Sequence, residues 1–285
     1  AVYRLRLKHP AADFLAAFGA HAGKTAVILL RLLLAVYLFF LSAFTLAALA
    51  DMIHIVYLPA TPNWILITWF MLCCFYAASK GVRAISLTAG VLSLMTMFTG
   101  HSVTAMATPK KELASLLPAF EFGYSPALWG ILVLCSIWVE LLFLLLIPVD
   151  IKEKRLFLFW TAGVLLNALM MLSTLTGALM IFGMGQADQF MFPALQTVRI
   201  ISLGFIDRFD IYGMLLMSLG CYIRTSLFLR LGCQLVAPEN VLDRRWGKLL
   251  ILAFGVGVAL AADCMAQTHL RMVQMVAFYA LLVCL

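Results

Sequence analysis

The feature that most constrains this sequence is a series of long apolar runs separated by short polar segments. The runs cover residues 25–50, 63–78, 84–100, 126–149, 156–184, 211–236, 248–262 and 272–285. A helix needs roughly 17–25 residues to cross a bilayer, so the shorter runs require flanking residues. The runs are continuous rather than alternating, which disfavours a transmembrane β-barrel. They predict an all-α polytopic membrane protein with about eight spans.

Composition excludes several other classes of protein. Hydrophobic residues make up 65% of the 285 residues and charged residues only 12%, about half of the roughly 25% that is typical of soluble domains. This composition excludes a soluble enzyme, a coiled coil, a disordered chain and a nucleic-acid binder with a basic face, because too few charges remain to cover a wet surface. The net charge of +7 is interpreted as a topological signal instead, since Lys and Arg gather in cytoplasmic loops.

The distribution of Lys and Arg predicts the orientation in the membrane. If the first residue is cytoplasmic, fifteen of the 20 basic residues fall on the inner side. Arg31, Arg224 and Arg230 are counted there, because long side chains reach the interface from within a span. The basic residues on the outer side are Lys110, Lys111, Arg199, Arg208 and Arg271. Both ends of the chain are therefore predicted to be cytoplasmic.

Two short segments repeat with an offset of five spans. Residues 10–24 precede the first long run and residues 188–210 precede the sixth, and each begins near a proline with a short helical pattern. Since five is odd, the segments lie on opposite faces, as in inverted-topology repeats. We expect a single transmembrane domain with a cytoplasmic segment 1–24, the rest of a first repeat in 25–100, and a second repeat in 126–285 whose last helix is cut short. On this interpretation we expect the first repeat to lack its first two helices and the chain to be a fragment.

Glu140 is the polar residue that most clearly suggests a site, because it lies near the middle of the fourth run. A carboxyl group at this depth costs roughly 2.5–3.5 kcal/mol on insertion scales, so it is either functional or a neutral carboxyl in a helix contact. Ser136 lies one turn earlier on the same face. Ser218 and Tyr222 are one turn apart in the sixth run, and Tyr37 is central in the first. Their hydroxyls are suited either to binding a polar small molecule or to hydrogen bonds between helices.

A charged group precedes the sixth run on the predicted outer side. It consists of Arg199, Asp207, Arg208 and Asp210. Opposite charges so close in sequence indicate either an outer-gate ion-pair network or a solvated surface. Histidines and cysteines show no metal-ligand spacing, and the sequence has no Ser-His-Asp, HExxH, GxSxG or P-loop pattern. We therefore expect no catalytic residue, no metal, no cofactor and no enzymatic activity.

Two stretches carry residues that together are typical of one known family. The first, residues 8–95, contains the outer Pro59-Ala-Thr-Pro62 turn and the inner Tyr76-Ala-Ala-Ser-Lys80-Gly81 segment. The second reads Phe192-Pro193, then Arg199, then Asp207-Arg208-Phe-Asp210. In order and spacing, the chain resembles the bacterial spore germination protein family, the B subunit of nutrient germinant receptors (GerAB type). The resemblance covers nearly the whole chain.

That family is similar to amino acid/polyamine/organocation transporters, so the resemblance implies a LeuT-like fold of ten helices in a five-plus-five inverted repeat. Helices one and six of such folds are broken at mid-membrane, and the ligand pocket lies between helices one, three, six and eight. The resemblance places these residues in the pocket: Tyr37 on helix three, Ser136, Trp138 and Glu140 on helix six, and Ser218 and Tyr222 on helix eight. The segment around Glu140 departs from the pattern, because it has no Gly or Pro at the expected break.

The resemblance also implies a function. The chain is expected to be an integral membrane subunit of a germinant receptor in the inner membrane of the spore. It would bind a small nutrient such as an amino acid, which stabilises one arrangement of helices, and pass the signal to A- and C-type subunits. The alternative is a proton-coupled amino acid transporter of the same fold, with Glu140 as the coupling site. A scaffold with no ligand of its own and a non-functional remnant are further alternatives.

Overall fold

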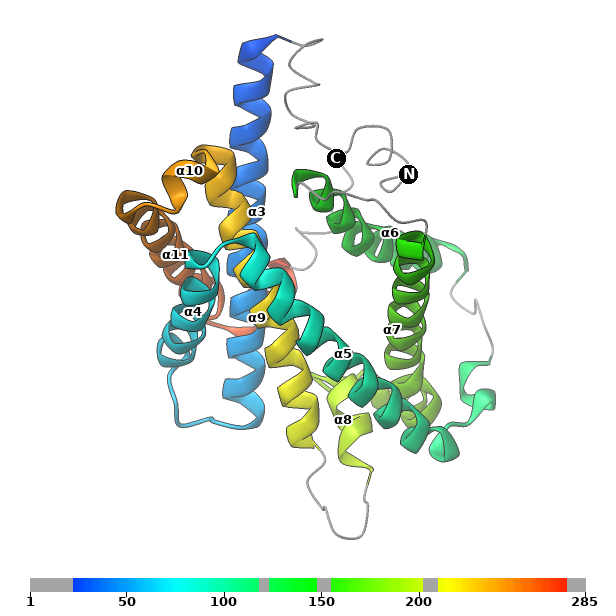
Figure 1. Ribbon diagram of the computed structural model, residues 1–285. Helices are drawn as coiled ribbons and strands as arrows, with labels where there is room; N and C mark the ends of the chain where they lie inside the picture. Colours follow the sequence, from blue (N-terminus) through cyan, green and yellow to red (C-terminus); the bar gives the residue numbers. More distant parts are fainter. Residues whose placement is uncertain (1–22, 118–122, 148–154, 202–209, 276–285) are drawn as a thin grey trace. The chain divides into compact units, whose positions relative to one another are not determined.

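The computed structural model describes residues 23–117, 123–147, 155–201 and 210–275, which form helices and connecting loops without a β-strand (Figure 1). These residues separate into two compact units. The first unit comprises residues up to 89, residues 129–152 and residues from 221 onward, and the second comprises residues 90–128 and 153–220. The division into repeats 25–100 and 126–285 remains a prediction.

Among the described residues, six helical stretches are long and apolar enough to cross a bilayer. They are Lys24–Val56, Val82–Lys110, Ser125–Phe143, Phe157–Ala187, Asp210–Val236 and Arg245–Met265. A shorter apolar helix, α4 (Asn63–Ser79), has 17 residues, which is about the lower limit for a span. The first seven apolar runs are thus confirmed as helical over their described residues, which exclude residues 148 and 149 of the fourth run. Of the eighth run, residues 272–275 are helical and the remainder lies outside the described residues.

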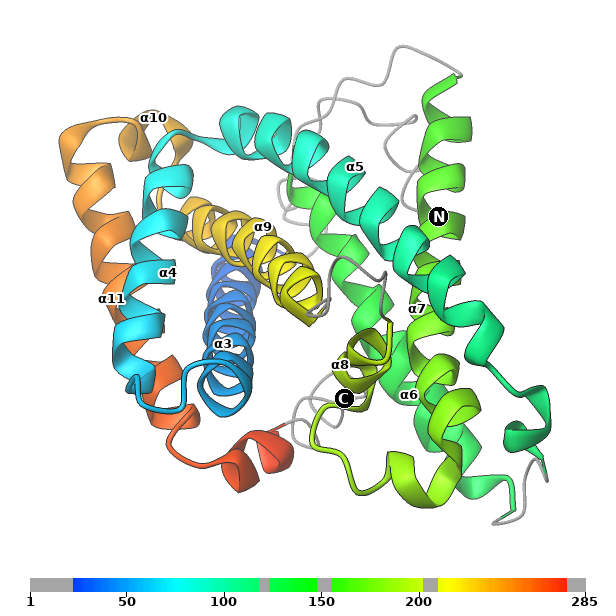
Figure 2. The ribbon, with the colours of Figure 1, turned by 90° about the horizontal axis from the view of Figure 1, so that it is seen from below.

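Helix α3 (Lys24–Val56) lies at the centre of the first unit, with α4, α9 (Asp210–Val236) and α11 (Arg245–Met265) beside it (Figure 2). Leu38, Leu41 and Leu46 on α3 are buried. The thiol of Cys221 on α9 donates to the carbonyl of Thr45 at 3.7 Å, which shows how closely α9 approaches α3. This unit also contains α10 (Glu239–Leu242), the 3₁₀ helix η3 (Glu140–Leu146), and parts of α5 (Val82–Ala107) and α6 (Ser125–Val139).

A glycine makes the sharp turn between α4 and α5. Gly81 has a φ of 91°, a left-handed conformation that glycine adopts without steric cost. The polar Ser79-Lys80-Gly81 segment that closes the second apolar run is therefore a turn on which the direction of the following span depends.

Gly247 allows α10 to approach α11. A Cβ atom at Gly247 would lie 2.2 Å from the Cα of Leu242 and 2.2 Å from the carbonyl oxygen of Val241, and these backbone atoms cannot rotate away. We expect Gly247→Ala to lower the stability by about 3 kcal/mol, as overpacking does, seen as a lower melting temperature in detergent. Gly255→Ala is the control, because its Cβ would come too close only to the flexible methyl end of Met71, at 2.7 Å, and would meet Leu229 at an ordinary contact distance of 3.9 Å. Equal melting temperatures for both variants would contradict this close approach.

The second unit contains the remainder of α5, α6 and α9 together with α7 (Arg155–Ala187), α8 (Pro193–Arg199) and the 3₁₀ helices η1 (Thr108–Lys110) and η2 (Leu113–Leu116). Helix α7 is interrupted at Gly183, where φ is 69°. Helix α8 begins at Pro193 and confirms the short helix predicted before the sixth run. Residues 10–22, which hold most of its predicted counterpart, lie outside the described residues.

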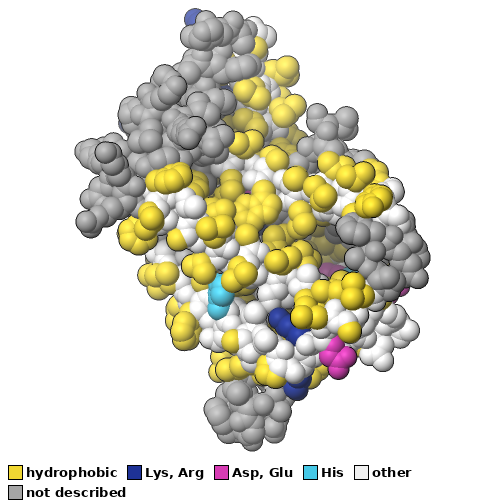
Figure 3. Space-filling view, turned by 90° about the vertical axis from the view of Figure 1, so that its right-hand side faces the viewer, with side chains coloured by type: hydrophobic (Ala, Val, Ile, Leu, Met, Phe, Trp, Pro, Cys, Tyr) yellow, Lys and Arg dark blue, Asp and Glu magenta, His cyan; other side chains and the backbone are white. Residues whose placement is uncertain are grey.

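Large apolar side chains are exposed along the spans. Figure 3 shows one face of the molecule on which hydrophobic side chains are widespread and charged ones are few. Independently of this view, the side chains of Leu94, Phe98 and Phe159 are each about 70–80% exposed. Contiguous apolar surface of this kind is rare on soluble monomers and is the surface that contacts lipid chains in a membrane-spanning helix.

Candidate functional site

An ion pair joins two helices of the first unit. Glu140 stands where α6 passes into η3, and Arg224 lies at the middle of α9. The Nη2 atom of Arg224 contacts Oε1 of Glu140. The Glu140 side chain is 15% exposed and that of Arg224 is 32% exposed. Charges at such depth in membrane-spanning helices face the protein interior or an aqueous cavity, so this pair is the first candidate for a binding site.

Aromatic rings pack beside the ion pair. The guanidinium carbon of Arg224 lies 5.5 Å from the ring centroid of Phe228, within cation–π range. Phe228 meets Phe143 edge-on at 5.7 Å, and Phe143 lies 5.7 Å from the ring of Tyr37. The rings belong to an apolar cluster formed by α3, η3 and α9. Tyr37, Glu140, Phe143, Arg224 and Phe228 are referred to below as the Glu–Arg cluster.

Arg224 keeps a donor that the ion pair does not use. Its Nε atom is buried and has no hydrogen-bond partner among the described residues. A guanidinium carries five N–H groups in a planar fork that fits a carboxylate with two parallel bonds. The Glu–Arg cluster is therefore chemically suited to accept a further carboxylate group on Arg224.

The main chain changes its helix type at Glu140. Helix α6 ends at Val139, and residues Glu140–Leu146 continue as a 3₁₀ helix. A 3₁₀ segment within a longer helical stretch often marks a functional hinge, because its hydrogen-bond geometry is poorer. The break expected in helix six thus has a counterpart at the predicted position. It is a change of helix type rather than an unwound segment, in keeping with the lack of Gly and Pro.

The structure brings Tyr37 and Glu140 into one cluster and places Tyr222 elsewhere. The backbone carbonyl of Tyr222 accepts a hydrogen bond from the Cys74 thiol of α4 at 3.9 Å. On a helix with 3.6 residues per turn, positions 222 and 224 point about 200° apart. Tyr222 therefore faces α4 while Arg224 faces Glu140.

The other predicted pocket residues take different positions. Trp138 is half-buried on α6, one residue before its end, and Ser218 is half-buried in the part of α9 that belongs to the second unit. The side chain of Ser136 lies outside the described residues. The assignment of these residues to a ligand pocket remains a prediction.

Sequence reasoning missed Arg224, Phe143 and Phe228. It expected Arg224 to extend to the inner interface, whereas the structure pairs Arg224 with Glu140. A signal was available: a lone acid and a lone base near the middle of two spans are each too costly in lipid unless they pair. The two phenylalanines had no such signal, because apolar residues fill every span.

The predicted outer charged group is described only in part. Nε of Arg199 lies 3.4 Å from Oδ2 of Asp210, with the arginine side chain 37% exposed and the aspartate 6% exposed. Asp207 and Arg208 lie outside the described residues. The role of this group as an outer gate stays a prediction.

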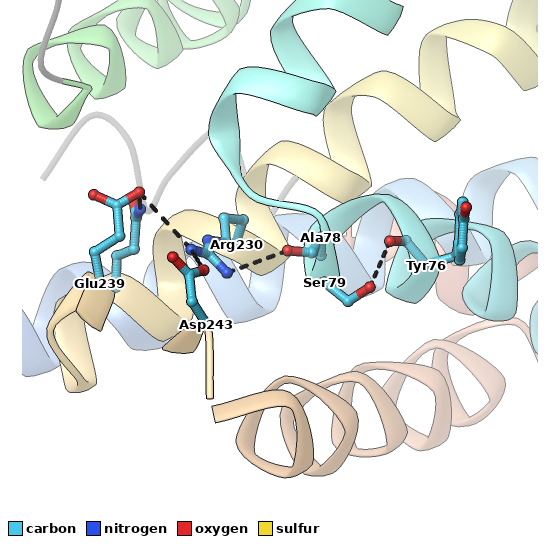
Figure 4. Close-up of polar contacts among 7 residues, drawn as sticks. Tyr76, Ala78, Ser79, Arg230, Glu239 and Asp243 are labelled. Atoms are coloured by element: carbon cyan, nitrogen blue, oxygen red, sulfur yellow. Dashed lines mark hydrogen bonds and ion pairs between the residues drawn. The ribbon is translucent and has the colours of Figure 1, made fainter. Parts of the chain in front are cut away.

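A fully buried arginine connects further elements of the first unit. Arg230 on α9 is fully buried, and its Nη2 lies 2.9 Å from Oδ1 of Asp243 and 3.8 Å from Oε1 of Glu239. Its Nη1 donates to the carbonyl of Ala78, at the end of α4, at 3.4 Å (Figure 4). The placement of Arg230 on the inner side of the membrane remains a prediction. The guanidinium is enclosed and links α4, α9 and the α10 region.

The apolar spans and the charged pair enclosed among them define an all-α polytopic membrane protein. Residues 1–269 match the family of spore germination proteins, and this chain belongs to that family. The chain is similar to "Spore germination protein XB" of Bacillus anthracis, with 30% identity over 173 residues. That alignment covers 60% of this chain and 48% of the relative, so it spans about half of the relative's length. No solved structure gives a significant match.

These comparisons confirm the family resemblance found in the sequence. The chain is a germination-related membrane protein with a lipid bilayer as its surroundings.

Proposed function

We propose that this chain is a membrane-embedded subunit of a spore germinant receptor, located in the inner membrane of the spore. In this role it binds a small nutrient of the amino acid class and passes the signal to A- and C-type receptor subunits. The observation that carries the proposal is the Glu140–Arg224 ion pair with aromatic rings beside it. Membership of the spore germination protein family supports the germination role.

The chemistry of the Glu–Arg cluster matches that of a free amino acid. A zwitterionic amino acid carries a carboxylate, which suits Arg224, and an ammonium group, which suits Glu140. The rings of Tyr37, Phe143 and Phe228 provide the apolar contacts that small-molecule sites use for the rest of a ligand.

A signal can arise from the same contacts. A ligand that binds both charges replaces the direct contact between α9 and η3 with contacts to itself. Since η3 begins at Glu140, such a ligand favours the arrangement in which the two helices are further apart. This is a population shift, and its size equals the difference in affinity of the ligand for the two arrangements.

A proton-coupled amino acid transporter is the second candidate. The observation that favours it is a carboxylate within a membrane-spanning stretch, since such groups often carry protons in transporters. Under this alternative, Glu140 is protonated and released from Arg224 once per transport cycle.

Reconstitution separates the two candidates. The full-length protein in proteoliposomes should bind radiolabelled amino acids saturably but take up no more of them than protein-free liposomes, with or without a pH gradient. An Arg271→Gln variant, which alters an exposed arginine on the predicted outer side, should bind the same amino acids equally well. Uptake driven by the pH gradient would establish the transporter instead, and the lack of any bound amino acid would refute nutrient binding.

A further inference from the structure

The second unit contains a cavity that is separate from the Glu–Arg cluster. Its volume is about 260 Å³, and it lies between α5, α7, α8 and the first part of α9. Most of its wall is apolar, formed by Val103, Met170, Leu195, Val198, Leu216 and Met217. Gly100, Gly177 and Gly213 also line it, and glycines leave room where larger side chains would fill the space.

Lys111 brings a positive charge to this cavity. Its Nζ donates to Oγ of Ser173 on α7 at 3.0 Å, and Ser173 in turn donates to Oγ1 of Thr104 on α5 at 3.3 Å. The backbone N–H of Glu112 donates to the carbonyl of Met180 at 3.0 Å, which holds the segment after α5 against α7. Lys111 is therefore positioned by both its side chain and its neighbouring backbone.

Two side chains keep hydrogen-bond donors at this place. The ammonium group has three N–H donors, and Ser173 takes one of them. Within the described part of the chain, Lys111 has no carboxylate partner, and no Asp or Glu lines the cavity. Thr104 accepts from Ser173, so its own hydroxyl hydrogen is left to donate. The Lys111 ammonium and the Thr104 hydroxyl both bond to Ser173. They are therefore suited to donate to the two oxygens of one anionic group.

We infer that this cavity is a binding site for a small molecule with an anionic head group and a short apolar body. Lys111 and Thr104 bind the head group, and the apolar wall contacts the body. A free monocarboxylate and the head group of an anionic lipid share this chemistry. The site lies in a different unit from the Glu–Arg cluster and goes beyond the proposed function.

The experiment uses full-length protein in nanodiscs of neutral phosphatidylcholine, with radiolabelled hexanoate as the probe and empty nanodiscs as the blank. Wild-type protein should bind hexanoate saturably at this site, and Lys111→Met, which keeps the apolar stem, should bind it at least ten-fold more weakly. Lys111→Arg should restore most of the affinity. Lys110→Ala is the matched control, because Lys110 is exposed, bonds to the carbonyl of Ile200 at 2.6 Å and does not line the cavity.

Competitors identify the anion and its source. Hexylammonium should not displace hexanoate, and displacement equal to that by unlabelled hexanoate would overturn the proposal. If dihexanoyl phosphatidylglycerol displaces the probe at a lower concentration than unlabelled hexanoate does, the site binds a lipid head group. If it displaces the probe more weakly, the site binds a free carboxylate. Either result supports an anion site.

Arg224→Gln distinguishes this proposal from the proposed function. The variant should keep hexanoate binding, because Arg224 belongs to the other unit. Loss of binding in Arg224→Gln but not in Lys111→Met would place hexanoate at the Glu–Arg cluster and refute the cavity site, while leaving the proposed function intact. The melting temperature of each variant is measured by circular dichroism. Equal values ensure that each variant is compared in its folded state.

Discussion

Replacing Glu140 with glutamine is expected to abolish the germination response of spores to amino acids, and Arg224→Gln is expected to do the same. Each change removes one of the two charges that the proposed ligand needs. Hydrogen bonds to charged groups contribute about 1.5–3 kcal/mol each, so the affinity should fall by about ten- to a hundred-fold. The measurement is the loss of optical density of spores after addition of an amino acid panel, together with binding of the same amino acids to the purified variants.

Exchanging the two charges provides the control for stability. Either single variant leaves one charge without its partner inside the membrane protein, which lowers stability as well as binding. The double variant Glu140→Arg with Arg224→Glu restores an ion pair between the same helices, so protein levels and melting temperature should recover. The nutrient response should not recover fully, because the positive and the negative side chain have exchanged positions and no longer match the carboxylate and the ammonium group of the ligand. A normal response from a stably accumulated Glu140→Gln protein would favour the scaffold alternative.

Neutralising Asp243 and Glu239 together, as Asp243→Asn with Glu239→Gln, is expected to destabilise the first unit although both residues are exposed. Their partner Arg230 is fully buried. After this change no carboxylate lies beside the guanidinium, and the acceptors that remain, the Ala78 carbonyl and the new amide oxygens, carry no charge. Leaving a buried charge without its partner costs about 3–5 kcal/mol, and the exposure of the carboxylates puts the expected loss near the lower value. Thermal unfolding in detergent at a fixed scan rate measures this loss as a lower apparent melting temperature.

The arginine variant tests the cause of this loss. Arg230→Met removes the buried charge and keeps most of the side-chain volume, so it should cost less than neutralising both carboxylates. Combining Arg230→Met with the double carboxamide change should recover part of the lost stability, because no charge is left to desolvate. Arg244→Met, at an exposed position on the same end of the unit, is the control and should leave the melting temperature unchanged. A double carboxamide protein as stable as the wild type would contradict the role of this pair.

Local sequence signals predicted one feature of the fold and not another. They predicted the short helix at residues 193–199, but not the form of the break at Glu140. Proline at the first helical position predicts where α8 begins, because its missing N–H is not needed there. The expected break near Glu140 came from the family resemblance, but its form depended on packing. Phe143 on η3 is buried against α3 and α9, and this contact holds a 3₁₀ segment without glycine or proline.

The sequence by itself determined that this chain forms apolar helices in a membrane, and also the family to which it belongs. Helical spans can be predicted locally, because every backbone N–H and C=O group in lipid must find its partner within the same helix. Tertiary structure alone decided which polar side chains meet. Glu140 and Arg224 are 84 residues apart, and Lys111 and Ser173 are 62 residues apart. Their contacts depend on how each helix is rotated about its axis. The sequence of a helix that is apolar on all sides does not indicate that rotation.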